Sequence, residues 1–240
     1  MKALEHSPGL VIQGFTPPLR LSDFKLIAFD MDSTLINIEC VDEIAAAVGR
    51  KAEVAAITEA AMRGEISDYK ASLRQRVALL KGVTVASMQQ VRDQTMQLNP
   101  GATELVQACQ AAGLKVLLVS GGFTFFTDSV RDRLAIDYTR SNVLEVKDGC
   151  LSGALLAQPW GDICDGEEKC KMLLQTCELL GITAQQAIAM GDGANDLPMM
   201  LACSQAGGLS VAYHAKPKVR EQAMVAINSG GLDRLLSVLH

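Results

Sequence analysis

KLIAFDMDST, residues 25–34, is the stretch from which the fold can be worked out. Its apolar residues run directly into an acidic loop, which is typical of a buried parallel strand with a loop at its carboxyl end. Later segments repeat this form: residues 115–119 precede Ser120-Gly121-Gly122, residues 187–190 precede Gly191-Asp192-Gly193, and residues 209–212 precede Tyr213-His214. We therefore expect a set of strands that each end in a glycine-rich or polar loop.

Helical segments lie between these strands. Residues 102–112 stop at Gly113 and residues 167–180 stop at Gly181, and glycine is the usual residue just past the end of a helix. Alternating strands and helices predict an α/β fold with a Rossmann-like parallel sheet. Ligands bind at the carboxyl ends of the strands of such sheets, so the acidic, Ser-Gly-Gly and Gly-Asp-Gly loops are expected to meet there.

The segment after the first strand has a different pattern. Helical spacing without a strand-like run predicts helices at residues 41–48, 52–63, 67–80 and 85–98. We interpret residues 39–99 as a helical-bundle cap inserted into a discontinuous core domain of residues 23–38 and 100–240. Residues 1–22 have little periodicity and are expected to form an irregular lead-in. Residues 142–156 predict a hairpin with Asp148-Gly149 at its turn.

Composition limits the possible partners. The net charge is −5 and aromatic residues make up 4% of the chain, so the clustered basic and stacking residues of nucleic-acid binders are not expected. No apolar run approaches the roughly 20 residues that span a bilayer, and residues 1–24 lack a signal-peptide pattern. The 7 cysteines form no CxxC pair and indicate reduced thiols. We expect a cytoplasmic protein whose partner is a small molecule, not nucleic acid or a membrane, and whose oligomeric state stays open.

Two short patterns suggest chemistry at the strand ends. Asp30 and Asp32 are close enough for one carboxylate to attack while the other handles a proton, and together they suit a hard cation. Ser120 with the amides of Gly121 and Gly122 suits a phosphate, because glycine lets the backbone approach closely. Taken alone, each pattern is more often a simple turn.

The combination of motifs is more specific. FDMDST at residues 29–34, VSGG at 119–122, Lys169 and GDGAND at 191–196 follow one another at strand ends. This order resembles the haloacid dehalogenase (HAD) superfamily over residues 25 to 230. Glu39, AMRG at 61–64, RVALLKG at 76–82 and SGGF at 120–123 are similar, within it, to the phosphoserine phosphatase family.

The resemblance implies a Mg²⁺-dependent phosphomonoester hydrolase that converts O-phospho-L-serine to L-serine and phosphate through a phosphoaspartate, as the final step of serine biosynthesis. Asp30 would be the nucleophile and Asp32 the general acid/base. Mg²⁺ would be bound by the Asp30 carboxylate, the Asp32 backbone carbonyl and Asp192. Lys169 would contact Asp30 and the phosphoryl oxygens, with Lys171 as the competing assignment.

The remaining roles also follow from the resemblance. Asn195 and Asp196 would lie just outside the metal, where they orient a metal-bound water or Lys169. Glu39 would bind the ammonium of the substrate and Arg76 its carboxylate, because the planar guanidinium suits a carboxylate. The phosphate would lie on Ser120, Gly121 and Gly122. Met62 and Tyr69 would line the cap side of the site. The family more often has Phe in place of Tyr69.

Other functions use the same residues. A phosphotransferase would pass the phosphoryl group from Asp30 to homoserine, and a phosphatase for phosphoethanolamine would not need Arg76. A binding protein without activity is disfavoured because Asp30, Asp32, Lys169 and Asp192 are all present. Since about 22 residues precede the first core strand, we also expect no N-terminal regulatory domain of the kind that longer relatives carry.

Overall fold

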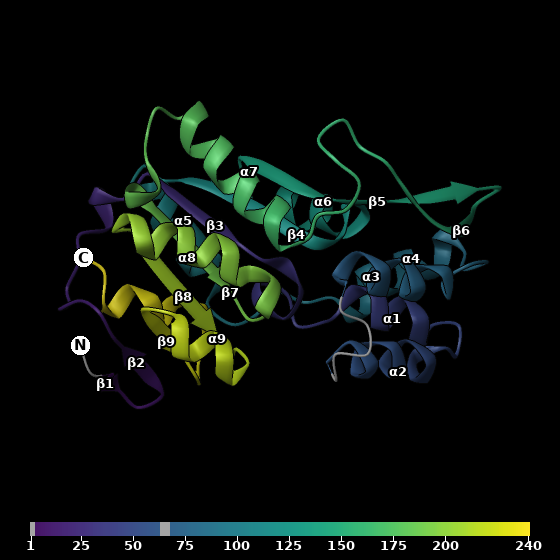
Figure 1. The fold of residues 1–240 in the computed structure, drawn as a ribbon, viewed down its shortest axis with the longest axis horizontal. Coiled ribbons are helices and arrows are strands. Elements are labelled where there is room, and N and C mark those ends of the chain that lie inside the picture. The colour runs from purple at the N-terminus through teal and green to yellow at the C-terminus, as the bar shows by residue number, and fades with distance from the viewer. Residues whose placement is uncertain (1–2, 63–67) are drawn as a thin grey trace.

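A parallel sheet forms the centre of the molecule. The computed structural model describes residues 3–62 and 68–240, and in this part of the chain the strand order is β1-β2-β9-β8-β7-β3-β4-β5-β6. The predicted strands are present as β3 (Leu26–Phe29), β4 (Lys115–Phe123), β7 (Ala187–Gly191) and β8 (Leu209–Tyr213). β3 pairs in parallel with β4 and β7, so the acidic loop leaves the middle of the sheet (Figure 1).

Helices cover both faces of the sheet. α5 (Ala102–Ala111) and α6 (Thr124–Leu134) pack on the face that carries Ile27 and Phe29. α7 (Gly166–Leu179) and α8 (Leu197–Ala206) pack on the face that carries Leu26 and Ala28. The alternation of residues 26–29 between two apolar cores confirms a strand that is buried on both sides, with the α/β layers expected of a Rossmann-like sheet.

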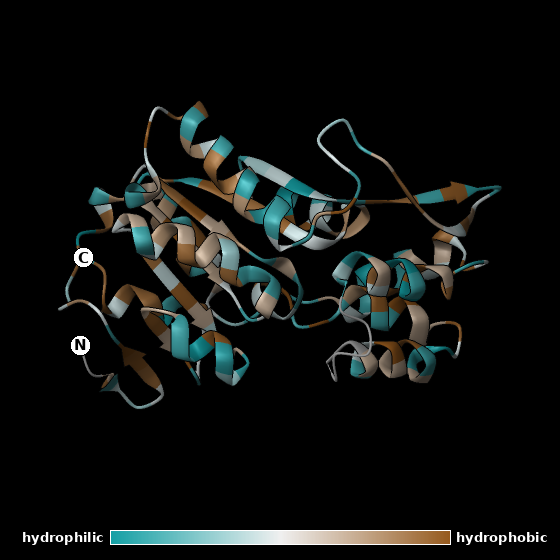
Figure 2. Ribbon diagram, viewed as in Figure 1, coloured by the Kyte–Doolittle hydropathy of each residue, from teal (hydrophilic) through white to brown (hydrophobic). Residues whose placement is uncertain are grey.

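The prediction of an irregular lead-in was wrong for residues 4–12. β1 (Leu4–Ser7) and β2 (Leu10–Ile12) form a hairpin, and β2 pairs antiparallel with β9 (Val225–Ile227), which follows the short helix α9 (Pro217–Gln222). The apolar residues of β2 (Figure 2) include Leu10 and Ile12, which are 0% and 2% exposed. These strands are short, and the hairpin joins the sheet only through the pairing of β2 with β9 at the other end of the chain, so no local period indicates them.

Helices fill the inserted segment, beside the sheet (Figure 1). They are α1 (Cys40–Ala46), α2 (Lys51–Met62), α3 (Tyr69–Ala78) and α4 (Val85–Gln90), which continues as a π-helical turn over Val91–Thr95. The helix predicted up to residue 98 ends earlier because Leu98 pairs with Ile36 as the chain returns to the sheet. The domain boundaries at residues 39 and 99 stay a prediction.

A hairpin links the sheet to these helices. β5 (Tyr138–Lys147) pairs first in parallel with β4 and then antiparallel with β6 (Cys150–Leu156). Asp148 and Gly149 have φ values of 50° and 75°, as the predicted two-residue turn requires. Three backbone hydrogen bonds join the hairpin to the segment from the end of α3 to the first residue of α4: Gly82 N to Leu151 O at 2.8 Å, Leu151 N to Val83 O at 2.8 Å, and Val85 N to Gly149 O at 3.0 Å.

Candidate active site

A buried lysine lies between two acidic side chains at the carboxyl ends of the central strands. Lys169, on the first turns of α7, is 0% exposed, and its Nζ lies 2.5 Å from Asp30 Oδ1 and 2.7 Å from Asp196 Oδ1. Lys171 has a side chain that is 52% exposed, and it lies near Glu168 at 3.4 Å. Of the two lysines that the sequence left open, Lys169 is therefore the one beside Asp30.

Three carboxylates form a group that suits a divalent cation. One oxygen each of Asp30, Asp192 and Asp196 lies within 4.8 Å of the others. The two oxygens of Asp196 are already bound, Oδ1 to Lys169 and Oδ2 to the amide of Gly193 at 3.0 Å. Asp30 and Asp192 are therefore the better candidates for direct ligands, and Asp196 fits the predicted place outside the metal.

Negative charge exceeds positive charge around Asp30. Burial, followed by the charge of Asp196, raises the pKa of Asp30 well above its usual range, against the opposing effect of Lys169. Burial and the charge of Asp196 raise the pKa of Asp192 to about 7. Burial alone would lower the pKa of Lys169, but Asp196 and Asp30 raise it, so this lysine stays protonated. A divalent cation would balance the remaining negative charge, so these residues fit Mg²⁺.

Asp32 has a separate set of partners. Its Oδ2 accepts from the backbone amide of Cys40 at 3.0 Å, and its Oδ1 lies 3.1 Å from Cys40 Sγ. Burial and the neighbouring charge of Glu39 raise the pKa of Asp32 to about 7. Glu39 itself is exposed, and its Oε1 accepts from Ser33 Oγ at 2.6 Å. Asp32 is thus held in place with a pKa suited to gaining and losing a proton near neutral pH.

The Ser-Gly-Gly stretch lies at the end of β4 rather than in a loop beyond it. Ser120 is buried, and its Oγ accepts from the Gly122 amide at 2.8 Å. A Cβ on Gly122 would lie 3.4 Å from Asp32 Oδ1, and a Cβ on Gly121 would lie only 2.1 Å from the hydroxyl of Tyr69. A side chain at residue 121 would force the Tyr69 hydroxyl to move, because that hydroxyl occupies the space beside the glycine.

The inserted helices bring further predicted residues to the same place. Burial raises the pKa of Tyr69, while the charges of Lys169 and Arg76 act in the opposite direction, so both cations lie near its hydroxyl. The Nε of Arg76 is buried and, among the described residues, has no hydrogen-bond partner. Asn195 packs over Gly193, with Oδ1 2.5 Å from the position of a Cβ there. The side chain of Met62 lies outside the described residues.

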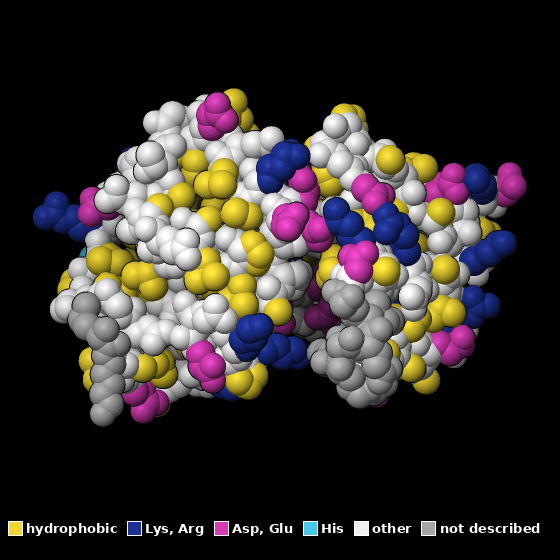
Figure 3. All heavy atoms as spheres, viewed as in Figure 1, with side chains coloured by type: hydrophobic (Ala, Val, Ile, Leu, Met, Phe, Trp, Pro, Cys, Tyr) yellow, Lys and Arg dark blue, Asp and Glu magenta, His cyan; other side chains and the backbone are white. Residues whose placement is uncertain are grey.

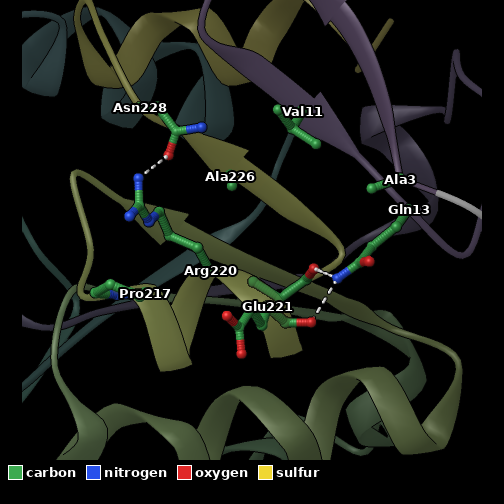
Figure 4. A pocket seen from close by; sticks show the side chains of 9 residues that line it. Ala3, Val11, Gln13, Pro217, Arg220, Glu221, Ala226 and Asn228 are labelled. Carbon is green, nitrogen blue, oxygen red and sulfur yellow. Dashed lines mark hydrogen bonds between the residues drawn. The ribbon is translucent and has the colours of Figure 1, made fainter.

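The surface is hollowed between the sheet and the inserted helices, and acidic side chains lie inside this hollow (Figure 3). A second pocket, of about 360 Å³, lies near the β1–β2 edge of the sheet, between β2, β9 and α9 (Figure 4). In it Arg220 lies 3.5 Å from Asn228, and Gln13 donates to the carbonyls of Glu221 and Ala223. None of the predicted site residues lines this second pocket.

Comparison with known proteins agrees with this geometry. A model of haloacid dehalogenase-like hydrolases matches residues 27–201, a range that includes Asp30, Ser120, Lys169 and Asp192. The chain belongs to the haloacid dehalogenase-like hydrolase family. It is a member with an α/β core that is similar to phosphoserine phosphatases of known structure.

Within the HAD-like hydrolases, the chain is similar over its whole length to phosphoserine phosphatases. The chain is 76% identical over 239 residues to the phosphoserine phosphatase of Polaromonas sp., with 100% of both chains covered. It is 74% identical to that of Albidiferax ferrireducens, covering 97% of this chain and 96% of the relative. A solved phospho-aspartyl intermediate analogue of phosphoserine phosphatase aligns with a TM-score of 0.80 at 35% identity, covering 90% of this chain and 99% of the other.

The sequence did not indicate two residues near this HAD-like site, Cys40 and Lys216. Cys40 follows Glu39, but nothing in its neighbourhood distinguishes it from an ordinary buried thiol before its contacts with Asp32 are known. Lys216 donates its backbone amide to Asp192 O at 3.1 Å, and its charge lowers the pKa of Asp192 against the larger effects of burial and Asp196. Both residues reach the site through the fold, and neither falls in a recognisable motif.

Proposed function

We propose that this protein hydrolyses O-phospho-L-serine to L-serine and phosphate through a phosphoaspartate on Asp30, which is the last step of serine biosynthesis. The observation that carries the proposal is the contact of Asp30 with the fully buried Lys169, beside Asp192 and Asp196. The similarity to phosphoserine phosphatases over the whole chain supports the choice of substrate.

The first step transfers the phosphoryl group to the protein. A carboxylate oxygen of Asp30 forms a bond to phosphorus as the bond from phosphorus to the serine oxygen breaks. Asp32 donates its proton to that serine oxygen and becomes a carboxylate. Lys169 holds Asp30 through Oδ1 and supplies positive charge for the phosphoryl oxygens, which would otherwise repel an anionic nucleophile.

Mg²⁺ fits the acidic group, with Asp30, the backbone carbonyl of Asp32 and Asp192 as the residues that would hold it. When bound, it would neutralise charge on the phosphoryl oxygens. Asp196 would act differently, because its oxygens are used by Lys169 and by the Gly193 amide. Its part is to keep Lys169 directed at Asp30, and Asn195 is proposed to assist nearby.

The second step releases phosphate. Asp32, now a carboxylate, takes a proton from water as the water oxygen forms a bond to phosphorus. The bond between Asp30 and phosphorus breaks, which restores the Asp30 carboxylate and frees phosphate. One carboxyl thus serves as acid and then as base, and a pKa of about 7 suits both roles.

Recognition of the serine part uses groups from the inserted helices and the acidic loop. Arg76 has a buried Nε without a partner among the described residues, which a substrate carboxylate would satisfy. Glu39 would bind the ammonium, and its influence on the pKa of Asp32 supports its position beside the leaving group. The phosphate would lie on Ser120, Gly121 and Gly122, with Tyr69 and Met62 on the cap side.

The test is phosphate release from O-phospho-L-serine, phosphoethanolamine and O-phosphothreonine, each in Mg²⁺ and in EDTA, with homoserine added in a parallel reaction. In Mg²⁺ we expect phosphate to be released much faster from phosphoserine than from the other two substrates. EDTA should abolish this release. Equal activity on phosphoethanolamine would contradict the roles of Glu39 and Arg76, and phosphohomoserine formed as fast as phosphate would make the protein a phosphotransferase.

We also propose the cytoplasm as its compartment, since all 7 cysteines are unpaired.

A further inference from the structure

The pairing of β4 with β5 is interrupted beside the Ser-Gly-Gly stretch. Val119 pairs with Arg140, and the next pair joins Phe123 to Asn142. Four steps along β4 (119 to 123) therefore span only two along β5 (140 to 142), so residues 120–122 leave the regular ladder. Their carbonyl groups lose the backbone partners that the ladder would have provided and need donors from elsewhere.

The side chain of Asn142 provides these donors. The residue is 1% exposed, and its Nδ2 lies 2.8 Å from Gly121 O and 3.3 Å from Gly122 O. Its Oδ1 accepts from the amide of Cys164 at 2.8 Å. A carboxamide is the one neutral side-chain group that donates two hydrogen bonds and accepts another from a single planar unit, so the residue type matches the position.

These contacts decide the direction of the neighbouring amides. The C=O and N–H of a trans peptide point in opposite directions, so carbonyls of Gly121 and Gly122 turned toward Asn142 direct the next two amides away from it. The Gly122 amide there donates to Ser120 Oγ, which leaves the hydroxyl hydrogen of Ser120 for another acceptor. This side faces Asp32, since a Cβ on Gly122 would lie 3.4 Å from Asp32 Oδ1.

The other end of the same carboxamide fixes the start of α7. Cys164 is followed by Asp165, whose side chain caps the helix by accepting from the amide of Glu168 at 2.9 Å. The carbonyl of Asp165 accepts from the amide of Lys169, also at 2.9 Å. Asn142 therefore joins the two segments that are expected to surround a phosphoryl group, although it lies behind both of them.

We propose that Asn142 is a positioning residue that fixes the amides of Gly122 and Phe123 and the start of the Lys169 helix in one arrangement for a phosphate anion. The inference rests on the proposed function for the substrate, phosphoserine, but phosphate binding itself tests it separately. Asn142 does not touch the reacting atoms. Its effect is on the affinity for the phosphoryl group and not on the affinity for the amino-acid part.

The experiment measures binding of inorganic phosphate and of L-serine by calorimetry in Mg²⁺, for the wild type, Asn142→Leu and Asn142→Asp. Leucine keeps the volume without any hydrogen bond, and aspartate keeps the acceptor for Cys164 while it removes both donors. We expect the Kd for phosphate to rise about tenfold or more in both variants, and the Kd for serine to change less than about threefold. If the leucine variant does not fold, the aspartate variant alone decides.

Ser141→Ala is the matched control. Ser141 is the preceding residue of β5, is 4% exposed, and shares a hydrogen bond of 2.9 Å with Thr127, away from the Ser-Gly-Gly stretch. It is expected to lower the melting temperature without changing either Kd. An unchanged Kd for phosphate in the Asn142 variants, or an equal loss for phosphate and serine, would overturn the inference. Failure of the wild type to hydrolyse phosphoserine while it binds phosphate would refute the proposed function only.

Discussion

Charged side chains at the strand ends of the sheet differ from those proposed to bind the serine part of the substrate. The difference is whether the protein itself supplies their partners. Lys169 is fully buried, and both of its acidic partners come from the protein itself. Arg76 also has a buried nitrogen, but that atom has no partner among the described residues, and Glu39 is exposed with only a hydroxyl contact. Groups proposed for the reaction are therefore pre-assembled, whereas groups proposed for selectivity are left for the substrate to satisfy.

The largest expected effect comes from changing one of the groups proposed for the reaction. Asp30→Asn removes the nucleophile and should reduce phosphate release by about 10⁴-fold or more. It should leave the melting temperature near that of the wild type, because Asp196 still pairs with Lys169. Steady-state assays with thermal melts check both points, and substantial residual turnover would mean that another residue attacks phosphorus.

Exchanging the buried lysine for a neutral residue should affect both activity and folding. Lys169→Met leaves Asp30 and Asp196 buried without a cation, which should lower the free energy of unfolding by about 3 kcal/mol or more and turnover by at least about 100-fold. Lys171→Met is the matched control, since that side chain is half exposed. If Lys171→Met lowered activity and stability as much as Lys169→Met, the assignment of Lys169 as the active-site lysine would be wrong.

For Arg76, whose buried Nε has no partner among the described residues, the expected effect depends on the substrate. Arg76→Ala should reduce kcat/KM for phosphoserine by about 100-fold, because a charged carboxylate loses its hydrogen bonds. The same variant should change kcat/KM for phosphoethanolamine, which has no carboxylate, by only a few-fold. A uniform loss for both substrates would show that Arg76 supports the structure of the cap rather than selectivity.

The free energy of unfolding should depend on pH, and Mg²⁺ should oppose this dependence. Burial raises the pKa values of Asp32 and Asp192 to about 7, from 3.8, so the folded protein binds more protons than the unfolded chain between these values. In EDTA the free energy of unfolding should therefore fall, on the order of 1 kcal/mol or more, as the pH rises from 4 to 7.

Mg²⁺ favours the ionised carboxylates, so it should raise the melting temperature more at pH 8 than at pH 5. Melting curves at the two pH values, with and without the metal, measure this difference. An equal increase at both values would mean that the carboxylate of Asp192 does not bind the metal.

The smallest expected effect concerns contacts between the two regions. Arg74 of α3 pairs with Asp162, and Lys70 lies 3.3 Å from Asp165. The Arg74 pair is about half exposed, so Arg74→Ala should change kcat/KM by less than about fivefold, and salt should weaken the effect. Arg131→Ala, which breaks an exposed ion pair within α6, is the control and should have no effect on kinetics. A large loss in the Arg74 variant alone would make this pair essential for closing the site.

Residues with chemistry at strand ends could be predicted from the sequence because each stands within two residues of the end of an apolar run. Asp30, Ser120 and Asp192 belong to this group, and the structure brings the acidic loop, the end of β4 and the Gly-Asp-Gly loop together. Their catalytic and binding roles stay predictions. A parallel sheet with short loops leaves little choice about where strand ends lie, so the order of motifs was sufficient to locate them.

Contacts between distant segments could not be predicted in this way. Nothing local indicates that Asn142 bonds Gly121 and Cys164, or that Cys40 bonds Asp32, because hydrogen-bond partners depend on the packed fold. The strand at residues 10–12 was missed for the same reason, since its partner is β9. Periodicity describes which face of an element is buried, but not which distant residue lies opposite.

The hydrogen bonds between the hairpin β5–β6 and the chain after α3 have a consequence for engineering. Grafting residues 39–99 from a relative would exchange Gly82, Val83 and Val85 but keep their partners Gly149 and Leu151. A mismatch there would leave backbone groups unpaired at the junction. The part of the chain to transplant therefore consists of two pieces, the inserted helices and the hairpin tip, and chimaeras that move both should retain more folded protein than chimaeras that move one.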